Sequence, residues 1–493
     1  MSNIKGKTIN GIAWSVTERF SLQVMHIIVS IILARLLSPS EFGLIGMLAI
    51  FTSVAQSILD SGFGSALIQK KNATRTDSSS IFYFNLLIGI VLALIFYLFA
   101  PQISEFYNQP ILKPITRVLS LSLIINAFSL VQLSILRKKL LYKNLFFVST
   151  ITVLVSGVCG IIAAYQGLGV WSLVIQNLTQ SITQAILLWF LSKWRPVGHF
   201  SLASLKTMFS FGSKLLIAGL IETVFRNLYQ TFIGRVYSPS DVGFYSRAVT
   251  MESAASKATS MALGQVIFSA FSPYQDDKGV LRKVHDKTIR MSMFVLMPVM
   301  IGLIATAEPL FLFLLTEKWA ESIPYFQLLC VIGLLFPIVV QNYNILRITG
   351  HTGLHLKLEI FKYVITIIAI TLTYKHGILA LIYGQIAVAI ISHFVVSYFA
   401  GRLVNYSLFD QFKSLFPISI TAIIMGGIVF FVGKIGIESN FLKLIIQAGV
   451  GIIVYFILNK IIKSRELEEL LSIIKNFLLS LYSKVKNLLW KSR

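Results

Sequence analysis

Charged side chains are scarce in this sequence, and their scarcity is the first constraint on what the protein can be. Only 13% of the 493 residues are Asp, Glu, Lys or Arg, whereas 56% are hydrophobic. Soluble globular domains carry about 25% charged residues, so an ordinary soluble fold is excluded. Apolar runs of about 20 residues, each able to cross a hydrocarbon core of roughly 30 Å, repeat along the chain. The sequence therefore predicts a polytopic membrane protein.

The sequence also lacks the motifs and long loops that catalysis would need. No Gly-x-x-x-x-Gly-Lys-Ser/Thr segment is present, so this chain does not use ATP through a P-loop. Gly-x-Ser-x-Gly and His-Glu-x-x-His are missing as well. Because the predicted loops are no longer than about 20 residues, they leave no room for a soluble catalytic domain. We expect neither an enzyme nor a bound cofactor.

Cysteine is nearly absent. Cys159 and Cys330 are the two in the chain, and both fall inside apolar runs. A disulfide framework and a metal cluster are therefore not expected, and the two thiols are interpreted as small buried hydrophobes.

The apolar runs are continuous rather than alternating, which predicts α-helices, since an open sheet would leave backbone groups unpaired in lipid. We expect an all-α integral membrane fold with fourteen spans. Their approximate ranges are 9–35, 43–66, 80–100, 115–136, 146–165, 170–191, 210–234, 244–270, 289–314, 325–346, 356–374, 378–401, 414–433 and 441–460.

The basic residues, which give a formal net charge of +23, are distributed unevenly between alternate loops. The loops on the side of the N-terminus, together with the C-terminal tail, hold 29 Lys and Arg residues, and the loops on the other side hold six. This asymmetry follows the positive-inside rule and predicts that both termini are cytoplasmic. The charge thus reflects membrane topology, and we expect no nucleic-acid partner.

A short polar segment occurs twice, which indicates an internal duplication. Arg35-Leu-Leu-Ser-Pro-Ser-Glu-Phe-Gly43 returns as Arg235-Val-Tyr-Ser-Pro-Ser-Asp-Val-Gly243, and Ser53, Ala55 and Gly64 recur with the same offset. In each copy the proline cannot continue the preceding helix, a serine can cap the next helix, and the glycine allows close packing.

The duplication predicts two equivalent six-helix lobes, related by an axis along the membrane normal, plus two additional C-terminal spans. The last segment carries leucines at helical spacing with lysines between them, which predicts a basic amphipathic helix on the cytoplasmic face. The predicted divisions are an N-terminal lobe 1–191, a cytoplasmic linker 192–209, a C-terminal lobe 210–402, two additional spans 403–461 and the amphipathic segment 462–493.

Several segments resemble a known family. Leu37-Ser-Pro-Ser-Glu-Phe-Gly-Leu44, Ser61-Gly-Phe-Gly-Ser-Ala-Leu-Ile-Gln-Lys70, Leu136-Arg-Lys-Lys-Leu-Leu-Tyr-Lys143 and Gly167-Leu-Gly-Val-Trp-Ser-Leu-Val174 are similar to bacterial polysaccharide transporters, the Wzx-type lipid-linked oligosaccharide flippases. These belong to a superfamily that includes multidrug and toxic-compound extruders and the lipid II flippase. The resemblance implies two lobes around a central cavity with alternating access.

The resemblance implies a flippase of the bacterial inner membrane that translocates undecaprenyl-diphosphate-linked oligosaccharide for surface polysaccharide (O-antigen, capsule or exopolysaccharide) biosynthesis. The lipid bilayer, a coupling H⁺ or Na⁺ and the polysaccharide polymerase machinery are its candidate partners. A cation-coupled multidrug exporter of the same superfamily is the main alternative, and a membrane glycan polymerase or ligase is a third.

Charged residues inside predicted spans are the candidate site residues, because each is energetically costly in lipid. The cations that could contact the diphosphate lie in the first two helices of each lobe: Arg19, Arg226, Lys257, Lys214 and Arg247. Arg19 and Arg226 are preferred because the arginine fork matches phosphate oxygens. By resemblance, Arg19 takes the place of a span-one arginine important in lipid II flippases. Internal ion pairing, such as Glu222 with Arg226 at i and i+4, and snorkelling of Lys214 and Arg247 are the structural alternatives.

Three carboxylates in the same helices, Asp60, Glu222 and Glu252, are candidates for ion coupling. Pairing of Asp60 with a lysine such as Lys257 is the alternative. His26 and His393 are single histidines on apolar helices, for which packing with a hydrogen bond is the simpler expectation.

Overall fold

The structure is a computed structural model, and the residues it describes are 21–60, 62–70, 72–271, 277–472 and 475. Within α8 and α9, the side chains of 207, 210, 211, 214, 215 and 257–271 lie outside this description. The described residues form helices and no strands, which confirms the all-α prediction. After the helix Ser21–Leu36, the elements are α2 (Pro39–Asp60), α3 (Phe63–Gln69), α4 (Arg75–Phe106), α5 (Leu112–Lys138), α6 (Tyr142–Tyr165), α7 (Trp171–Ser192), α8 (Leu202–Val236), α9 (Pro239–Phe271), α10 (Lys278–Ala305), α11 (Ala307–Leu315), the 3-10 turn η2 (Glu317–Trp319), α12 (Ser322–Ile348), α13 (Thr352–Thr373), α14 (Ile378–Val404), α15 (Leu408–Val432) and α16 (Asn440–Ile461).

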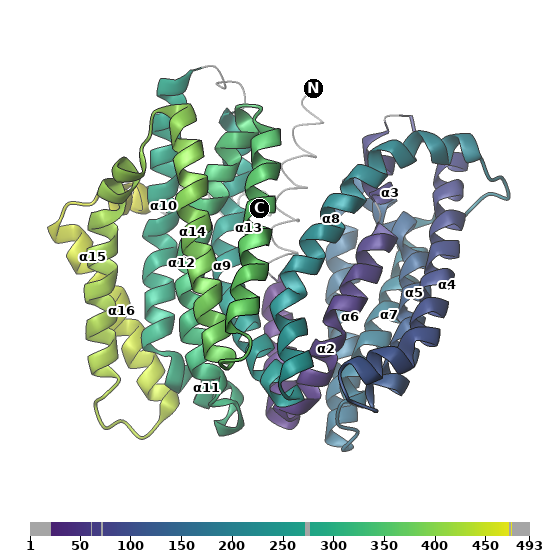
Figure 1. The fold of residues 1–493 in the computed structure, drawn as a ribbon, viewed down its shortest axis with the longest axis horizontal. Coiled ribbons are helices and arrows are strands. Elements are labelled where there is room, and N and C mark those ends of the chain that lie inside the picture. The colour runs from purple at the N-terminus through teal and green to yellow at the C-terminus, as the bar shows by residue number, and fades with distance from the viewer. Residues whose placement is uncertain (1–20, 61, 71, 272–276, 473–474, 476–493) are drawn as a thin grey trace, which may run out of the picture. The chain divides into compact units, whose positions relative to one another are not determined.

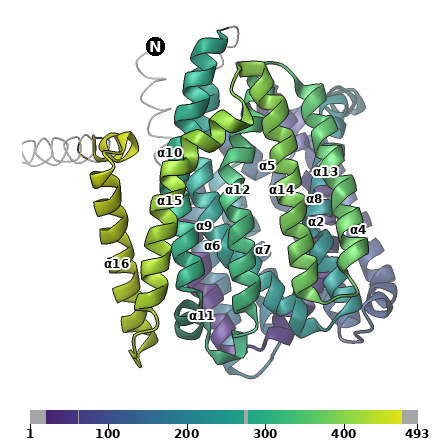
Figure 2. The ribbon, with the colours of Figure 1, turned by 60° about the vertical axis from the view of Figure 1, so that its left-hand side comes forward.

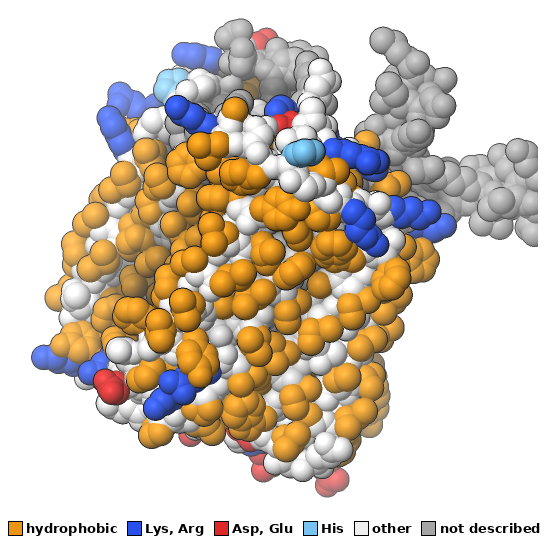
Figure 3. All heavy atoms as spheres, turned by 90° about the vertical axis from the view of Figure 1, so that its right-hand side faces the viewer, with side chains coloured by type: hydrophobic (Ala, Val, Ile, Leu, Met, Phe, Trp, Pro, Cys, Tyr) orange, Lys and Arg blue, Asp and Glu red, His pale blue; other side chains and the backbone are white. Residues whose placement is uncertain are grey.

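Long helices occupy all fourteen predicted spans, as far as the structure describes them (Figure 1). Nine helical stretches among the described residues are long and apolar enough to cross a membrane. The other predicted spans coincide with Ser21–Leu36, α7, α8, α9 and α13. Figure 3 shows the consequence on one face, where apolar side chains cover a broad band and lysines and arginines gather toward its two ends.

Two predicted spans are each divided into two helices in the structure. The range 43–66 divides at Gly62, whose φ of 70° ends one helix and starts α3. The duplicated copy has Ala262 at this position and α9 continues through it to Phe271, because an alanine does not favour the left-handed conformation. The range 289–314 divides at Thr306, since Pro309 has no N–H to donate to the carbonyl of Ala305.

The chain forms two compact units, Met1–Ser246 and Arg247–Arg493, which are considered separately. The boundary falls inside α9, whereas the duplication predicts lobes joined by the linker 192–209. The first unit includes α8 because this helix packs along α2. The lobe division describes the duplication in the sequence and stays a prediction.

In the first unit, α4 and α5 form an antiparallel pair in close contact. A Cβ atom on Gly89 would lie 2.6 Å from that of Ala127, so glycine is what permits this approach. The linker is held to α4, because the backbone N–H groups of Val197 and Ser201 donate to the hydroxyls of Ser79 and Ser80 at 2.9 and 2.8 Å.

In the second unit, the core lies among α10, α12, α14 and α15, whose arrangement is visible in Figure 2. Residues 465–472 are helical, and Leu467 is buried in this core cluster. The start of the predicted amphipathic helix is therefore seen, and the rest of it, apart from Lys475, lies outside the described residues.

Candidate functional site

The two copies of the duplicated turn have the same local structure. The backbone N–H and the hydroxyl of Ser38 both donate to the Glu41 carboxylate, and the Glu41 N–H donates to the Ser38 hydroxyl. Ser238 and Asp241 repeat all three hydrogen bonds. Each turn is thus a capping box that begins α2 or α9 with a proline in the first helical position. The predicted serine caps are confirmed.

The pairing of α2 with α8 fixes the depth of the charged residues on α8. The Gln230 amide donates to the carbonyl of Gly46 at 2.9 Å, and a Cβ on Gly219 would lie 3.4 Å from the Ser57 hydroxyl. Because the two helices run antiparallel in this register, Arg226 lies level with the middle of α2. It is ten residues before the end of α8 at Val236, or about 15 Å along the axis.

Arg226 and Glu222 are both exposed on the surface of the first unit at this depth. They are one helical turn apart, so their side chains lie on the same face of α8. An exposed charge at the depth of the hydrocarbon core cannot face lipid without a large penalty, and such residues face a water-filled cavity or other protein. This pair therefore has the position that a polar transport site requires.

Asp60 ends α2 and is exposed. Its carboxylate accepts a hydrogen bond from the Gln56 amide at 3.2 Å, and the Gln56 oxygen accepts one from Asn126 of α5 at 3.1 Å. This chain of amides holds Asp60 in place, and the described residues offer it no lysine or arginine within ion-pair distance.

Arg247 and Glu252 point into the second unit. Arg247 is 5% exposed, and its guanidinium lies over the ring of Trp319, 5.1 Å from the centroid. Glu252 is partly buried against α12, because a Cβ on Gly333 would lie 2.5 Å from its carboxylate oxygen. These two residues therefore contact the core of their own unit. Arg19 and the side chains of Lys214 and Lys257 lie outside the described residues.

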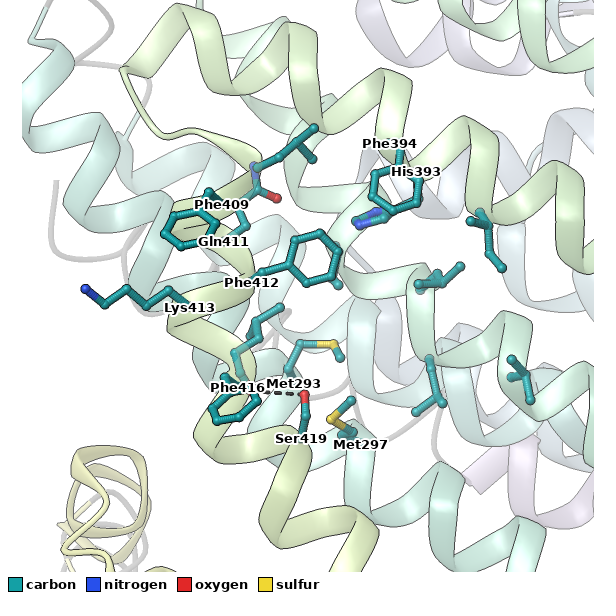
Figure 4. A pocket seen from close by; sticks show the side chains of 17 residues that line it. Met293, Met297, His393, Phe394, Phe409, Gln411, Phe412, Lys413, Phe416 and Ser419 are labelled. Atoms are coloured by element: carbon teal, nitrogen blue, oxygen red, sulfur yellow. Dashed lines mark hydrogen bonds between the residues drawn. The ribbon is translucent and has the colours of Figure 1, made fainter.

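Sequence reasoning missed an apolar pocket of about 690 Å³ in the second unit, between α10, α12, α14 and α15 (Figure 4). Its lining is almost entirely apolar, with Met293, Met297, Phe394 and Phe412 among the residues in view. Gln411 also lines it and is 3% exposed, and neither of its amide atoms has a hydrogen-bond partner among the described residues. Such a pocket suits an apolar chain.

The first residues of α15, from Leu408, form one wall of the pocket. The predicted span began six residues after Leu408 and so omitted this wall, although the sequence contained a capping motif that marks the earlier start. Ser407 and Asp410 have the spacing of a capping box, and the structure contains both of its hydrogen bonds.

A buried polar chain crosses three helices of the second unit. His285 of α10 is hydrogen-bonded to the Asn342 amide oxygen at 3.0 Å, and the Asn342 nitrogen donates to Ser397 at 2.8 Å. Ser397 in turn lies 3.4 Å from the His393 ring nitrogen. His393 is thus packed and hydrogen-bonded, as expected, and it also lines the apolar pocket.

Comparison with known proteins identifies the family. Residues 32–324 match the family model described as "Polysaccharide biosynthesis protein". The chain belongs to this family. The resemblance seen in the sequence is therefore confirmed.

Curated members of similar length align with most of the chain. It is 25% identical to the lipopolysaccharide biosynthesis protein WzxC of Escherichia coli K12, covering 80% of this chain and 81% of that protein. It is 25% identical to the teichuronic acid biosynthesis protein TuaB of Bacillus subtilis, covering 87% and 90%. The succinoglycan biosynthesis transport protein ExoT of Rhizobium meliloti is 26% identical, with 68% of each chain covered.

Solved structures share the fold of this chain. The lipid II flippase MurJ in an inward closed conformation superposes with a TM-score of 0.75 at 15% identity, covering 92% of this chain and 98% of MurJ. An inward-facing multidrug resistance MATE transporter gives a TM-score of 0.60 at 15% identity, covering 80% and 99%. At this identity the likeness establishes the fold alone.

Proposed function

We propose that this protein is a flippase that translocates an undecaprenyl-diphosphate-linked oligosaccharide across the bacterial inner membrane by alternating access, for surface polysaccharide biosynthesis. The observation that carries the proposal is the exposed pair of Arg226 and Glu222 on α8, level with the middle of α2, in a member of the polysaccharide biosynthesis family. The positive-inside charge pattern supports a cytoplasmic location for both termini.

The diphosphate needs cationic partners to leave water, and a guanidinium binds two of its oxygens at once. Arg226 is the described residue best placed to do this, since it is exposed, whereas Arg247 is engaged with Trp319. Arg19, Lys214 and Lys257 remain candidates from the sequence. The candidates for binding a coupling H⁺ or Na⁺ are Glu222, Asp60 and Glu252. Glu222 lies one helical turn from Arg226.

The lipid part of the substrate requires an apolar environment throughout. The pocket beside α15 offers one, with about 690 Å³ lined by methionine, leucine and phenylalanine side chains. We assign part of the isoprenoid chain to this pocket, while the remainder stays in the bilayer.

Complementation tests the function. The wild type, Arg226→Ala and Arg19→Ala are expressed at equal membrane levels in a bacterium without its own oligosaccharide flippase, with Arg75→Ala as a control that removes an exposed arginine at the start of α4. We expect the wild type and the control to restore surface glycan. Arg226→Ala should instead accumulate lipid-linked precursor.

Two outcomes would contradict parts of the proposal. Restoration by Arg226→Ala at the wild-type level would remove this residue from the substrate site. The wild type is also tested in several flippase-deficient strains that make different glycans. If it restored surface glycan in none of them but made the same cells resistant to drugs, the multidrug exporter alternative would replace the flippase.

A further inference from the structure

A second, polar cavity lies where the chain turns from α16 into the helix at 465–472. Its volume is about 200 Å³, which is room for about six water molecules and so for a phosphate group. Two hydrogen bonds stabilise this turn: the Ser464 N–H donates to the Asn459 carbonyl at 2.9 Å, and the Ser464 hydroxyl accepts from the Leu467 N–H at 3.3 Å. Within the turn, Lys463 has a φ of 53°.

The side chains around this cavity carry an excess of positive charge. Lys463, Arg465 and Arg290 line it, and Glu466 is the one carboxylate among the described residues of its lining. Glu466 is already engaged, since it is 6% exposed, pairs with Arg290 and accepts a hydrogen bond from Ser464 at 2.9 Å.

Lys463 and Arg465 are both exposed, and neither has an ion-pair partner in the part of the chain that the structure describes. Two cations at one cavity, with the neighbouring carboxylate neutralised by a third, form a binding site for an anion. The start of the helix at 465 adds its positive dipole end to the same place.

The rest of the lining indicates that the anion belongs to a lipid. Pro417 and Ile418 of α15 and Ile462 after α16 form the other wall. Along the same two helices, large apolar side chains are exposed at Ile424 (44%), Ile453 (58%) and Ile457 (48%). A molecule with a phosphate in the cavity can therefore lay apolar chains along α15 and α16, as free phosphate cannot.

We propose that this cavity, formed by Arg290, Lys463, Arg465 and Glu466 against Pro417 and Ile418, is a binding site for the headgroup of an anionic phospholipid of the leaflet that the C-terminal segment faces. It is separate from the residues assigned to the oligosaccharide substrate. Basic pockets between transmembrane helices are a recognised way to hold anionic lipids.

The test uses the full-length purified protein and counts bound lipid by native mass spectrometry during titration with phosphatidylglycerol or phosphatidylcholine. The site variant is Lys463→Gln with Arg465→Gln. The matched control is Lys434→Gln with Lys443→Gln, which removes the same charge near the opposite ends of α15 and α16. Elution volume and melting temperature establish that both variants are folded.

We expect the wild type to bind phosphatidylglycerol in preference to phosphatidylcholine. The site variant should bind phosphatidylglycerol roughly thirtyfold more weakly, and the control should stay within about twofold of the wild type, since each basic side chain near an anionic headgroup contributes several-fold. Equal loss in both variants, or no loss in the site variant, would overturn the proposal. Displacement of the bound phosphatidylglycerol by millimolar inorganic phosphate would overturn the lipid assignment in favour of a free anion.

Discussion

Gly43 and Gly243 hold equivalent positions in the two copies of the duplicated turn, and each packs against the turn of the other copy. A Cβ on Gly43 would overlap the carbonyl oxygen of Pro239, and a Cβ on Gly243 would overlap that of Pro39. Reciprocal contacts of this kind are those of a twofold axis. The duplication is therefore not only a repeat in the sequence, because its two copies form one junction within the first unit.

Replacing either glycine with alanine should weaken this junction. The methyl group has no room against backbone atoms, so we expect Gly43→Ala and Gly243→Ala each to lower the free energy of unfolding by about 1–3 kcal/mol. The melting temperature of the purified protein measures this. Since both substitutions act on one junction, the double variant should show less than the sum of the two effects.

Gly449→Ala is the control for these substitutions, because a Cβ there has nothing within 4 Å. It lies in the interior of α16, where alanine has a higher helix propensity than glycine, and it should leave the protein unchanged or up to about 1 kcal/mol more stable. If Gly449→Ala lowered the free energy of unfolding as much as Gly43→Ala, added methyl groups would be destabilising in general. The effect of Gly43→Ala could then not be attributed to the junction.

The capping serines offer a second prediction. Ser38→Ala and Ser238→Ala each remove a hydroxyl that accepts a backbone N–H at the start of a helix, and each should cost about 1 kcal/mol. Ser38→Asp and Ser238→Asp keep an acceptor but place it beside Glu41 or Asp241, so they should recover only part of the loss. Thermal unfolding of the four variants makes the comparison. If both alanine variants were as stable as the wild type, the carboxylates of Glu41 and Asp241 would be sufficient to cap the two helices without the serine hydroxyls.

A charge series at position 226 separates binding from packing. Arg226→Gln should reduce flipping roughly tenfold or more, because a hydrogen bond to a charged group contributes about 1.5–3 kcal/mol. Arg226→Lys keeps the positive charge without the guanidinium fork, so its flipping rate should lie between those of the wild type and Arg226→Gln. Transport of lipid-linked oligosaccharide into the outer leaflet of reconstituted vesicles is the measurement.

Glu222→Gln distinguishes the two roles assigned to this face of α8. If Glu222 only pairs with Arg226, neutralising it should leave transport close to the wild-type level at every pH. If it binds the coupling ion, transport should lose its dependence on the ion gradient. Loss of activity together with a lower melting temperature would instead assign Glu222 to folding.

The buried chain through Asn342 predicts a large effect on stability. Asn342→Ala removes the side-chain hydrogen bond of His285 and the donor to Ser397, so we expect the free energy of unfolding to fall by about 1–3 kcal/mol. Ser397→Ala removes the hydrogen bond from Asn342 to Ser397 and leaves the hydrogen bond of His285 with Asn342 intact. It should therefore destabilise less, and a larger effect from Ser397→Ala would contradict this order.

The sequence by itself determined the membrane class, the positions of the long helices, the duplication and the caps of the two turns. Hydropathy and capping depend on residues within a few positions of one another, so they can be read along the chain. The same rules place Glu222 and Arg226 on one face of α8, and a single intramembrane arginine is conspicuous in any apolar run.

Only the tertiary structure decided which of the charged residues are exposed and which are packed. Arg226 and Arg247 both lie inside predicted spans, but in the structure one is exposed and the other lies over Trp319, 72 positions away in the chain. The contact of Gly43 with Pro239, the chain from His285 to Asn342 and both cavities also join distant segments. Such contacts depend on how helices pack, and helix packing follows from the fit of whole surfaces rather than from any local pattern.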